Sequence, residues 1–74
     1  MKIRSLYFLD CDDVVNADWT REVCNSLVYE GNNIFTDSGE GWRVEYCFNE
    51  DFTSVNIITG SVGIKQRVQV TFED

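Results

Sequence analysis

The side chains best suited to chemistry stand together near the N-terminus, in the segment Leu9-Asp10-Cys11-Asp12-Asp13. This segment follows a run of apolar and aromatic residues, so the sequence predicts a group of carboxylates at the end of a strand. Carboxylates in such a place can hold Mg²⁺, and one of them can attack a phosphoryl group. Metal-assisted phosphate chemistry is therefore the reaction class to weigh against a purely structural acidic loop.

The segment resembles the first motif of the haloacid dehalogenase superfamily, in which a strand ends in Asp-x-Asp. The resemblance implies that Asp10 is the nucleophile, that Asp12 is the general acid/base and that Mg²⁺ lies nearby. It is confined to residues 9–16, and the family's glycine after the second aspartate is Asp13 here. The family has a parallel sheet and a later lysine, whereas the rest of this chain predicts antiparallel hairpins with Lys65 inside a strand. A small Mg-dependent phosphohydrolase is thus an alternative, and we favour a solvated acidic loop that leads into a helix.

No other pattern predicts catalysis, and we expect neither a cofactor nor a metal. The chain lacks histidine, and its 3 cysteines, Cys11, Cys24 and Cys47, are far apart. These residues give neither the usual ligands of a tetrahedral zinc site nor a base that would activate a thiolate. We therefore expect free thiols, with Cys24 in the core. The glycine-rich segment 38–41 does not open a helix and lacks a P-loop lysine, so it is a turn.

The charge of the chain restricts its partners. There are 13 acidic and 6 basic residues, which gives a net charge of -7. Nucleic acids and anionic membranes bind proteins through Lys and Arg, so neither is expected to bind this chain directly. A basic protein surface is the natural complement, although a purely solubilising role for the charge stays open.

The carboxylates must be positioned by the elements around them. Residues 3 to 9 predict a strand that ends at the acidic segment. A helix is predicted from near residue 16 to residue 30, because Val15, Trp19, Val23 and Leu27 recur at every fourth position. Gly31 is expected to end this helix in a left-handed conformation.

Beyond the helix the apolar period changes to two. A short strand at 33–36 is followed by a turn at 37–41, and strands are predicted at 42–48, 52–59 and 64–72 with tight turns between them. The 74 residues are enough for one domain, residues 1–74. The predicted class is α+β with the order β-α-β-β-β-β, in which one amphipathic helix packs on a mainly antiparallel sheet of four or five strands in two layers. The expected core includes Trp19, Val23, Leu27, Trp42, Val44, Tyr46, Val68 and Val70.

The favoured function is a non-catalytic inhibitor or adaptor that binds another protein through an acidic surface. In size, acidity and absence of catalytic motifs, the chain looks like small phage anti-defence proteins, such as anti-CRISPR and anti-restriction proteins. That resemblance implies a target whose nucleic-acid channel is blocked, since the carboxylates would engage Lys and Arg that otherwise hold phosphates. An exposed aromatic side chain would anchor the contact. The predicted partner-binding residues are Asp10, Asp12, Asp13, Asp18, Glu22, Tyr29, Phe35, Asp37 and Glu40.

An accessory or structural subunit that acts by homo- or hetero-oligomerisation is the other alternative, and the chain is expected to be a monomer or a homodimer. The apolar run that begins the chain stops at Asp10, which is too short for a signal sequence or a membrane span. We therefore expect a cytoplasmic protein, in the host cell if it is phage-encoded.

Overall fold

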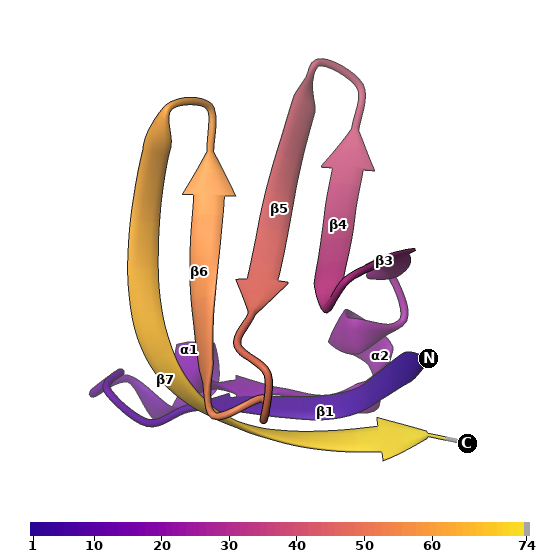
Figure 1. Cartoon of the computed structure of the whole chain (residues 1–74). Coiled ribbons are helices and arrows are strands. Elements are labelled where there is room, and N and C mark those ends of the chain that lie inside the picture. Colours follow the sequence, from indigo (N-terminus) through magenta and orange to yellow (C-terminus); the bar gives the residue numbers. More distant parts are fainter. Residues whose placement is uncertain (74) are drawn as a thin grey trace.

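The structure is a computed structural model that describes residues 1–73, and it consists of one antiparallel sheet with two short helices (Figure 1). The strands follow the order β2-β1-β7-β6-β5-β4-β3 in the sheet, and each neighbouring pair is antiparallel. Neither helix is long and apolar enough to cross a membrane. The elements in chain order are β1 (Lys2–Phe8), α1 (Val14–Ala17), β2 (Asp18–Trp19), α2 (Arg21–Cys24), β3 (Val28–Gly31), β4 (Ile34–Gly39), β5 (Trp42–Phe48), β6 (Ser54–Thr59) and β7 (Val62–Glu73).

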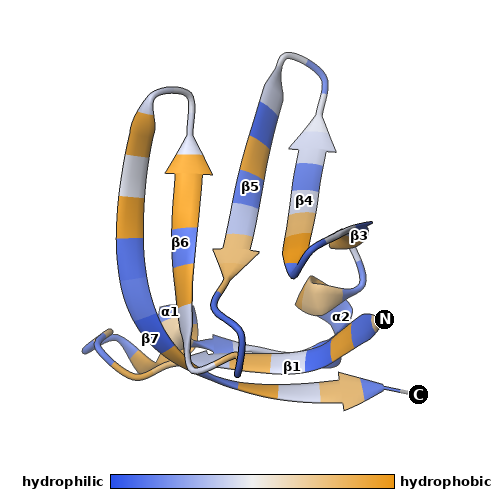
Figure 2. Ribbon diagram, in the orientation of Figure 1, coloured by the Kyte–Doolittle hydropathy of each residue, from blue (hydrophilic) through white to orange (hydrophobic). Residues whose placement is uncertain are grey.

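Tight turns build the meander from β3 to β7. Asn32 and Asn33 connect β3 to β4 with φ values of 55° and 62°, which is the type I′ conformation that matches the twist of a hairpin. Gly41 and Gly60, with φ of 79° and 61°, supply the positive φ that the next two-residue turns need. Apolar and polar residues alternate along β5 and along the first part of β7, as Figure 2 shows. One face of these strands is therefore apolar.

The sheet curls so strongly that strands distant in its order touch across its inner face. β7 pairs with β6 over its first half and with β1 over its second half, and Figure 1 shows it bending across the base of the molecule. Trp19 on β2 makes edge-on contacts with Phe8 at 5.1 Å and with Tyr46 on β5 at 5.5 Å between ring centroids. Strands β2 and β5 would be roughly 19 Å apart in a flat sheet, given about 4.8 Å per strand. The aromatic contact therefore requires the curl.

The core fills the inside of this curl. It contains residues from both sheet halves and from the two helices, namely Ile3, Leu6, Phe8, Ala17, Cys24, Leu27, Phe35, Tyr46, Phe48, Val55 and Val68. Of the predicted core residues, Leu27, Tyr46 and Val68 are buried, and Trp19, Val44 and Val70 are partly buried against them. The prediction was wrong for Val23 and Trp42, which are exposed.

The predicted fold class was also wrong. The protein is mostly β, with a seven-stranded sheet, and no long amphipathic helix covers that sheet. The predicted helix at 16–30 is replaced by α1 and α2 of four residues each, by β2 between them and by β3 after them. Because that helix is absent, the predicted order β-α-β-β-β-β and the predicted two-layer arrangement are both wrong.

Local backbone chemistry explains why the long helix does not form. Asp18 and Thr20 are extended, with ψ of 97° and 171°, so the helical path is interrupted twice. The interruption lets Trp19 and Asp18 pair with Leu6 and Tyr7 of β1. Asn, Asp, Thr and Val, which are weak helix formers, are frequent in residues 16–28, so tertiary pairing outweighs the helical period.

The long helix predicted from the sequence and the short elements of the structure imply different effects of substitutions at the apolar positions Val15 and Leu27. Leu27→Ala should reduce the free energy of unfolding by about 2–5 kcal/mol, because Leu27 is only 9% exposed. Val15→Ala should change it by less than about 0.5 kcal/mol, because Val15 is 85% exposed. Urea denaturation of both variants checks this, and similar large losses in the two would favour the long helix instead.

Candidate functional site

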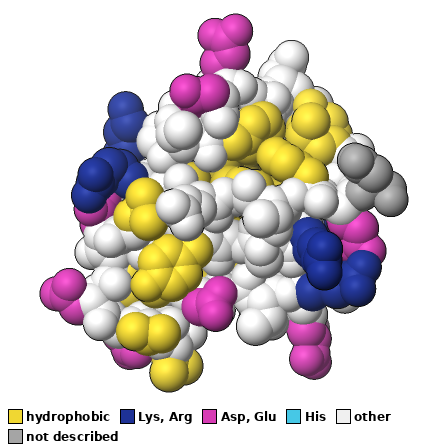
Figure 3. Space-filling model, turned by 90° about the horizontal axis from the view of Figure 1, so that it is seen from below, with side chains coloured by type: hydrophobic (Ala, Val, Ile, Leu, Met, Phe, Trp, Pro, Cys, Tyr) yellow, Lys and Arg dark blue, Asp and Glu magenta, His cyan; other side chains and the backbone are white. Residues whose placement is uncertain are grey.

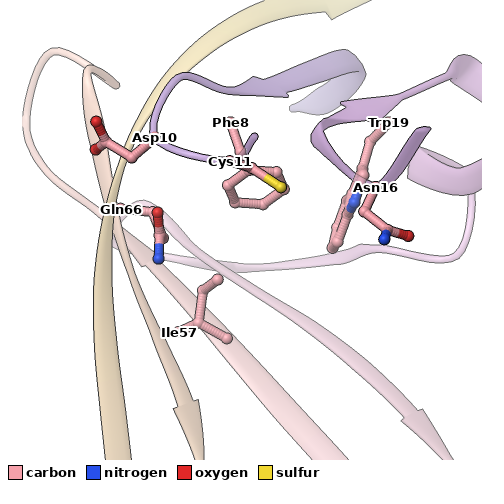
Figure 4. Close-up of a pocket in the computed structure, with 7 residues that line it drawn as sticks. All are labelled: Phe8, Asp10, Cys11, Asn16, Trp19, Ile57 and Gln66. Atoms are coloured by element: carbon pink, nitrogen blue, oxygen red, sulfur yellow. The ribbon is translucent and has the colours of Figure 1, made fainter. Parts of the chain in front are cut away.

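A cavity lies where β1 ends and the sheet bends. It has a volume of about 400 Å³, opens to solvent and is shown in Figure 4. Its size is within the range of small-ligand and side-chain pockets. The lining residues are Phe8, Asp10, Cys11, Asn16, Trp19, Ile57 and Gln66.

Four strands, the β1–α1 connection and α1 supply these walls. Phe8 ends β1, Trp19 lies on β2, Ile57 comes from β6 and Gln66 from β7. Asp10 and Cys11 of the β1–α1 connection, with Asn16 of α1, close one side. The apolar walls suit a hydrophobic side chain or ring, and the Asn16 and Gln66 amides offer both donors and acceptors. The lining would therefore suit an amphipathic group.

Asp10 and Arg67 form a clamp at the edge of the pocket. The Arg67 guanidinium donates to both carboxylate oxygens, with Nη2 at 2.5 Å from Oδ1 and Nε at 3.1 Å from Oδ2. The backbone N–H of Arg67 also donates to Oδ2 at 3.4 Å. The side-chain hydrogen bond from Arg67 outweighs the opposing effect of desolvation, which comes second. Together with the smaller effects of the backbone hydrogen bond and positive charge of Arg67, it holds the pKa of Asp10 below its ordinary value of 3.8. This carboxylate is committed to a structural contact at the end of β1.

Asp12 and Asp13, the other carboxylates of the acidic segment, have different roles. Asp13 caps α1: its Oδ1 accepts from the Val15 backbone N–H at 3.1 Å, and its Oδ2 accepts from the Asn16 amide at 2.7 Å. Asp12 is exposed in the connection between β1 and α1. Within residues 1–73, no three Cys, Asp or Glu side chains group so that they could hold a metal ion. The sheet beside this segment is antiparallel, unlike the parallel sheet that the dehalogenase resemblance implies.

The remaining predicted carboxylates are on three further parts of the fold. Asp18 lies on β2 and Glu22 on α2, and both are exposed. Asp37 lies on β4, where its Oδ2 accepts from the Ser26 hydroxyl at 3.4 Å, and Glu40 is in the β4–β5 turn. The structure thus brings Asp10, Asp12 and Asp13 into one loop and places these four elsewhere.

The two predicted aromatic anchors differ in their exposure to solvent. Tyr29 lies on the edge strand β3 and is exposed. Phe35 is only 1% exposed and packs edge-on against Phe48 at 5.6 Å, so the expectation that it is an exposed anchor was wrong. The two rings contact each other at 4.9 Å between centroids. Phe35 therefore supports Tyr29 from inside the core.

Most of the acidic side chains in the described chain lack a basic partner. Asp74, one of the 13 acidic residues, lies outside the described residues, and three of the other twelve pair with arginine. The pairs are Arg21–Glu73, Arg43–Glu45 and Arg67–Asp10. Nine carboxylates remain without an ion pair. Figure 3 shows that, on the base of the molecule, carboxylates are spread over the face and its rim, some of them beside Lys or Arg and others beside apolar side chains.

Comparison of the chain with protein-family models, with curated proteins and with solved structures finds no significant match.

The pocket residues Phe8, Asn16, Trp19, Ile57 and Gln66 were not selected from the sequence as functional residues. They are separated by up to 58 positions, from Phe8 to Gln66, and come together only because the sheet curls. The one local signal was the acidic segment, which marks the end of β1 and thereby one side of the pocket.

The Asp10–Arg67 clamp predicts a specific dependence of stability on pH. Because folding lowers the pKa of Asp10, its contribution is present above the ordinary value of 3.8 and is lost as the pH falls through the lower folded-state pKa. Asp10→Asn should therefore lower the melting temperature at neutral pH, and the difference from the parent should vanish in strong acid. Asp12→Asn, as the control, should not lower it. A difference for Asp10→Asn that stays constant throughout the acid titration would exclude the clamp.

Proposed function

We propose that the protein is a non-catalytic binding protein that inhibits or adapts a partner by engaging its basic surface. The proposal is carried by the nine carboxylates of residues 1–73 without an ion pair, together with the net charge of -7. Unneutralised charge on a small rigid scaffold produces a field that steers a basic partner toward it. The partner type is a protein whose Lys and Arg normally hold nucleic acid, as in the defence complexes blocked by phage anti-defence proteins.

The mechanism is competition for positive charge. Carboxylates on the scaffold occupy guanidinium and ammonium groups that otherwise bind phosphates, so the partner cannot hold both molecules. Asp12, Asp18, Glu22 and Glu40 are exposed and free to make such contacts, and Tyr29 offers an exposed aromatic ring on the edge strand β3. Direct binding of nucleic acid is disfavoured because the chain would have to overcome the repulsion of the phosphates.

Cytoplasmic action is part of the proposal. Cys11, Cys24 and Cys47 are all free thiols, which fits a reducing compartment. Burial raises the pKa of the Cys24 thiol, and burial together with the Glu45 charge raises that of Cys47. Both thiols are therefore poor nucleophiles, in keeping with a binding role.

A second candidate is an accessory or structural subunit that acts by oligomerisation. The observation that favours it is apolar exposure on the strands away from the core: Trp42 on β5 and Val62 and Ile64 on β7 are more than half exposed. Exposed apolar side chains gathered on one sheet face mark interaction surfaces. The mass of the purified chain in solution separates the two candidates, because this one requires a stable oligomer or a constitutive partner.

The inhibitor proposal predicts salt-dependent competition with nucleic acid. A panel of purified nucleic-acid-binding proteins, each loaded with a labelled single-stranded oligonucleotide, should include a target that releases its oligonucleotide when the chain is added. For that target, Asp12→Lys should slow association by about fivefold at low salt, with the difference shrinking as salt screens the charges. Stopped-flow fluorescence over a range of salt concentrations measures both effects.

Glu50→Lys is the matched control, because it changes the net charge equally but lies in the β5–β6 connection. It should slow association less than Asp12→Lys does. Equal slowing by both variants would mean that only total charge matters, and association that is indifferent to salt would contradict the proposal.

A further inference from the structure

The first part of β7 is an uncovered sheet edge. On one side Val62–Arg67 pair with β6, but on the other side β1 reaches only as far as Arg67, whose carbonyl accepts from the Leu9 N–H at 2.9 Å. No strand among residues 1–73 lies beside Val62–Gln66 on that side. The first four residues of this segment are exposed. A strand edge of this kind is a template for pairing with another chain.

The backbone groups that point outward from this edge can be identified. The Val68 N–H donates to the Thr53 carbonyl at 2.9 Å, toward β6, whereas Arg67 directs its carbonyl to Leu9 on the β1 side. Backbone groups alternate in direction along a strand, so Gly63 and Lys65 point away from β6, as Arg67 does. Asp10 already occupies the Arg67 N–H. Gly63 and Lys65 therefore offer two N–H donors and two carbonyl acceptors to an incoming strand.

The pocket lies next to this edge and on the inner face of the same sheet. Tyr46, Ile57 and Ile64 are cross-strand neighbours from β5 to β7, and Val55 and Gln66 form the next row toward the base. Ile57 and Gln66 line the pocket. A strand added beside β7 would direct alternate side chains to this inner face, where Ile64 is 54% exposed. A large apolar side chain at that point would meet the pocket walls.

The charges near the free edge of β7 indicate what kind of strand could pair with it. In the register of the β1–β7 pairing, Asp10 is the residue opposite Gln66, so the acidic segment 10–13 stands at one end of the free edge. A basic side chain at that end of an added strand would find the exposed carboxylate of Asp12, since Asp10 is paired with Arg67 and Asp13 caps α1. A second copy of this chain would bring two net charges of -7 together, which disfavours edge-to-edge homodimers.

We infer that the free edge of β7 binds an extended segment of a basic partner protein by antiparallel strand addition. The segment has apolar residues at alternate positions, one of which enters the pocket of Phe8, Trp19 and Ile57, and a Lys or Arg beside the 10–13 loop. Main-chain hydrogen bonds to Gly63 and Lys65 provide affinity, and the pocket provides selectivity. This inference deepens the proposed function and rests on it for the charge of the partner.

The test uses the full chain labelled with ¹⁵N and the synthetic peptide acetyl-Arg-Val-Thr-Phe-Thr-Val-Arg-amide. Its phenylalanine would lie opposite Ile64 and face inward, and its two threonines would lie opposite Gly63 and Lys65 on the outer face. Its first two residues would extend past Lys65 beside Asp10 rather than pair with β7. At a concentration that occupies about nine tenths of the protein, amide exchange at Gly63 and Lys65 should slow about tenfold, since exchange then proceeds from the free tenth. NMR hydrogen exchange measures this residue by residue.

Two modified peptides separate backbone pairing from charge. N-methylation of both threonines removes the N–H groups that face β7, so this peptide should bind about tenfold more weakly or worse. Replacement of both arginines by glutamate should also weaken binding, through charge alone.

Two protein variants give a matched pair. Lys65→Pro and Lys65→Ala both remove the ammonium, but only the proline removes the outward N–H, which β6 does not use. Lys65→Pro should bind the peptide about fivefold more weakly than Lys65→Ala does. The N-methylated peptide gives the same information on the unaltered protein should the proline variant fold poorly.

The outcomes distinguish the inference from the proposed function. Binding of the arginine peptide without protection of Gly63 and Lys65 would overturn strand addition and leave carboxylate recognition in place. Equal binding of the glutamate peptide, with protection, would overturn the basic partner and leave the edge as a peptide site. Protection that rises with protein concentration in the absence of peptide would identify a second copy as the occupant and overturn the inference. Failure of all peptides to bind would also overturn it, whereas the oligonucleotide competition above would still judge the proposed function.

Discussion

The change of pairing partner along β7 is the constraint on which the rest of the structure depends. β7 has 12 residues, but β6 pairs only with its first half and β1 only with its second. The change occurs at Arg67 and Val68. The Arg67 carbonyl accepts from the Leu9 N–H, whereas the Val68 N–H donates to the Thr53 carbonyl. A strand that serves two neighbours in succession must bend, and here the bend brings β1 and β2 over the inner face of β5 and β6. The core, the pocket and the free edge all follow from it.

Two arginines form ion pairs where strand ends meet other parts of the fold. Arg67 and Asp10 fix the end of β1 beside β7, and Arg21 pairs with Glu73 to join α2 to the end of β7. Exposed ion pairs contribute little to stability, so hydrophobic contacts such as that between Trp19 and Tyr46 must supply most of the closing energy. The role of the arginines is to define where strands end. The place where β1 stops determines how much of β7 stays uncovered.

The sequence predicted the parts of the fold that depend on local alternation and turns. The strand at 42–48 and the last strand were expected near where they lie, because a period of two and glycine-containing turns are local signals. The helix failed because apolar residues at every fourth position fit several short elements as well as one long helix. Gly31 illustrates the error: its positive φ, 93°, was expected for a helix end but serves the β3–β4 hairpin. Asn32-Asn33 was the hairpin signal that would have corrected it. The site was predictable only at the acidic segment, since the opposite pocket wall at Ile57 and Gln66 depends on long-range curling.

The distribution of charge bears on why the chain is so acidic. Three of the basic residues pair with carboxylates at positions that the fold uses, and nine carboxylates of the described chain make no such pair. Asp13 stabilises a helix end, so part of this excess has a local structural use. Asp12, Asp18, Glu22 and Glu40 have no ion pair, and the self-repulsion they add lowers the stability of a small domain. Solubility accounts for a net charge of this size, but it does not require an exposed carboxylate such as Asp12 beside an uncovered strand edge. A basic partner that pairs with that edge would relieve the repulsion on binding, so the same carboxylates that weaken the free protein would strengthen the complex.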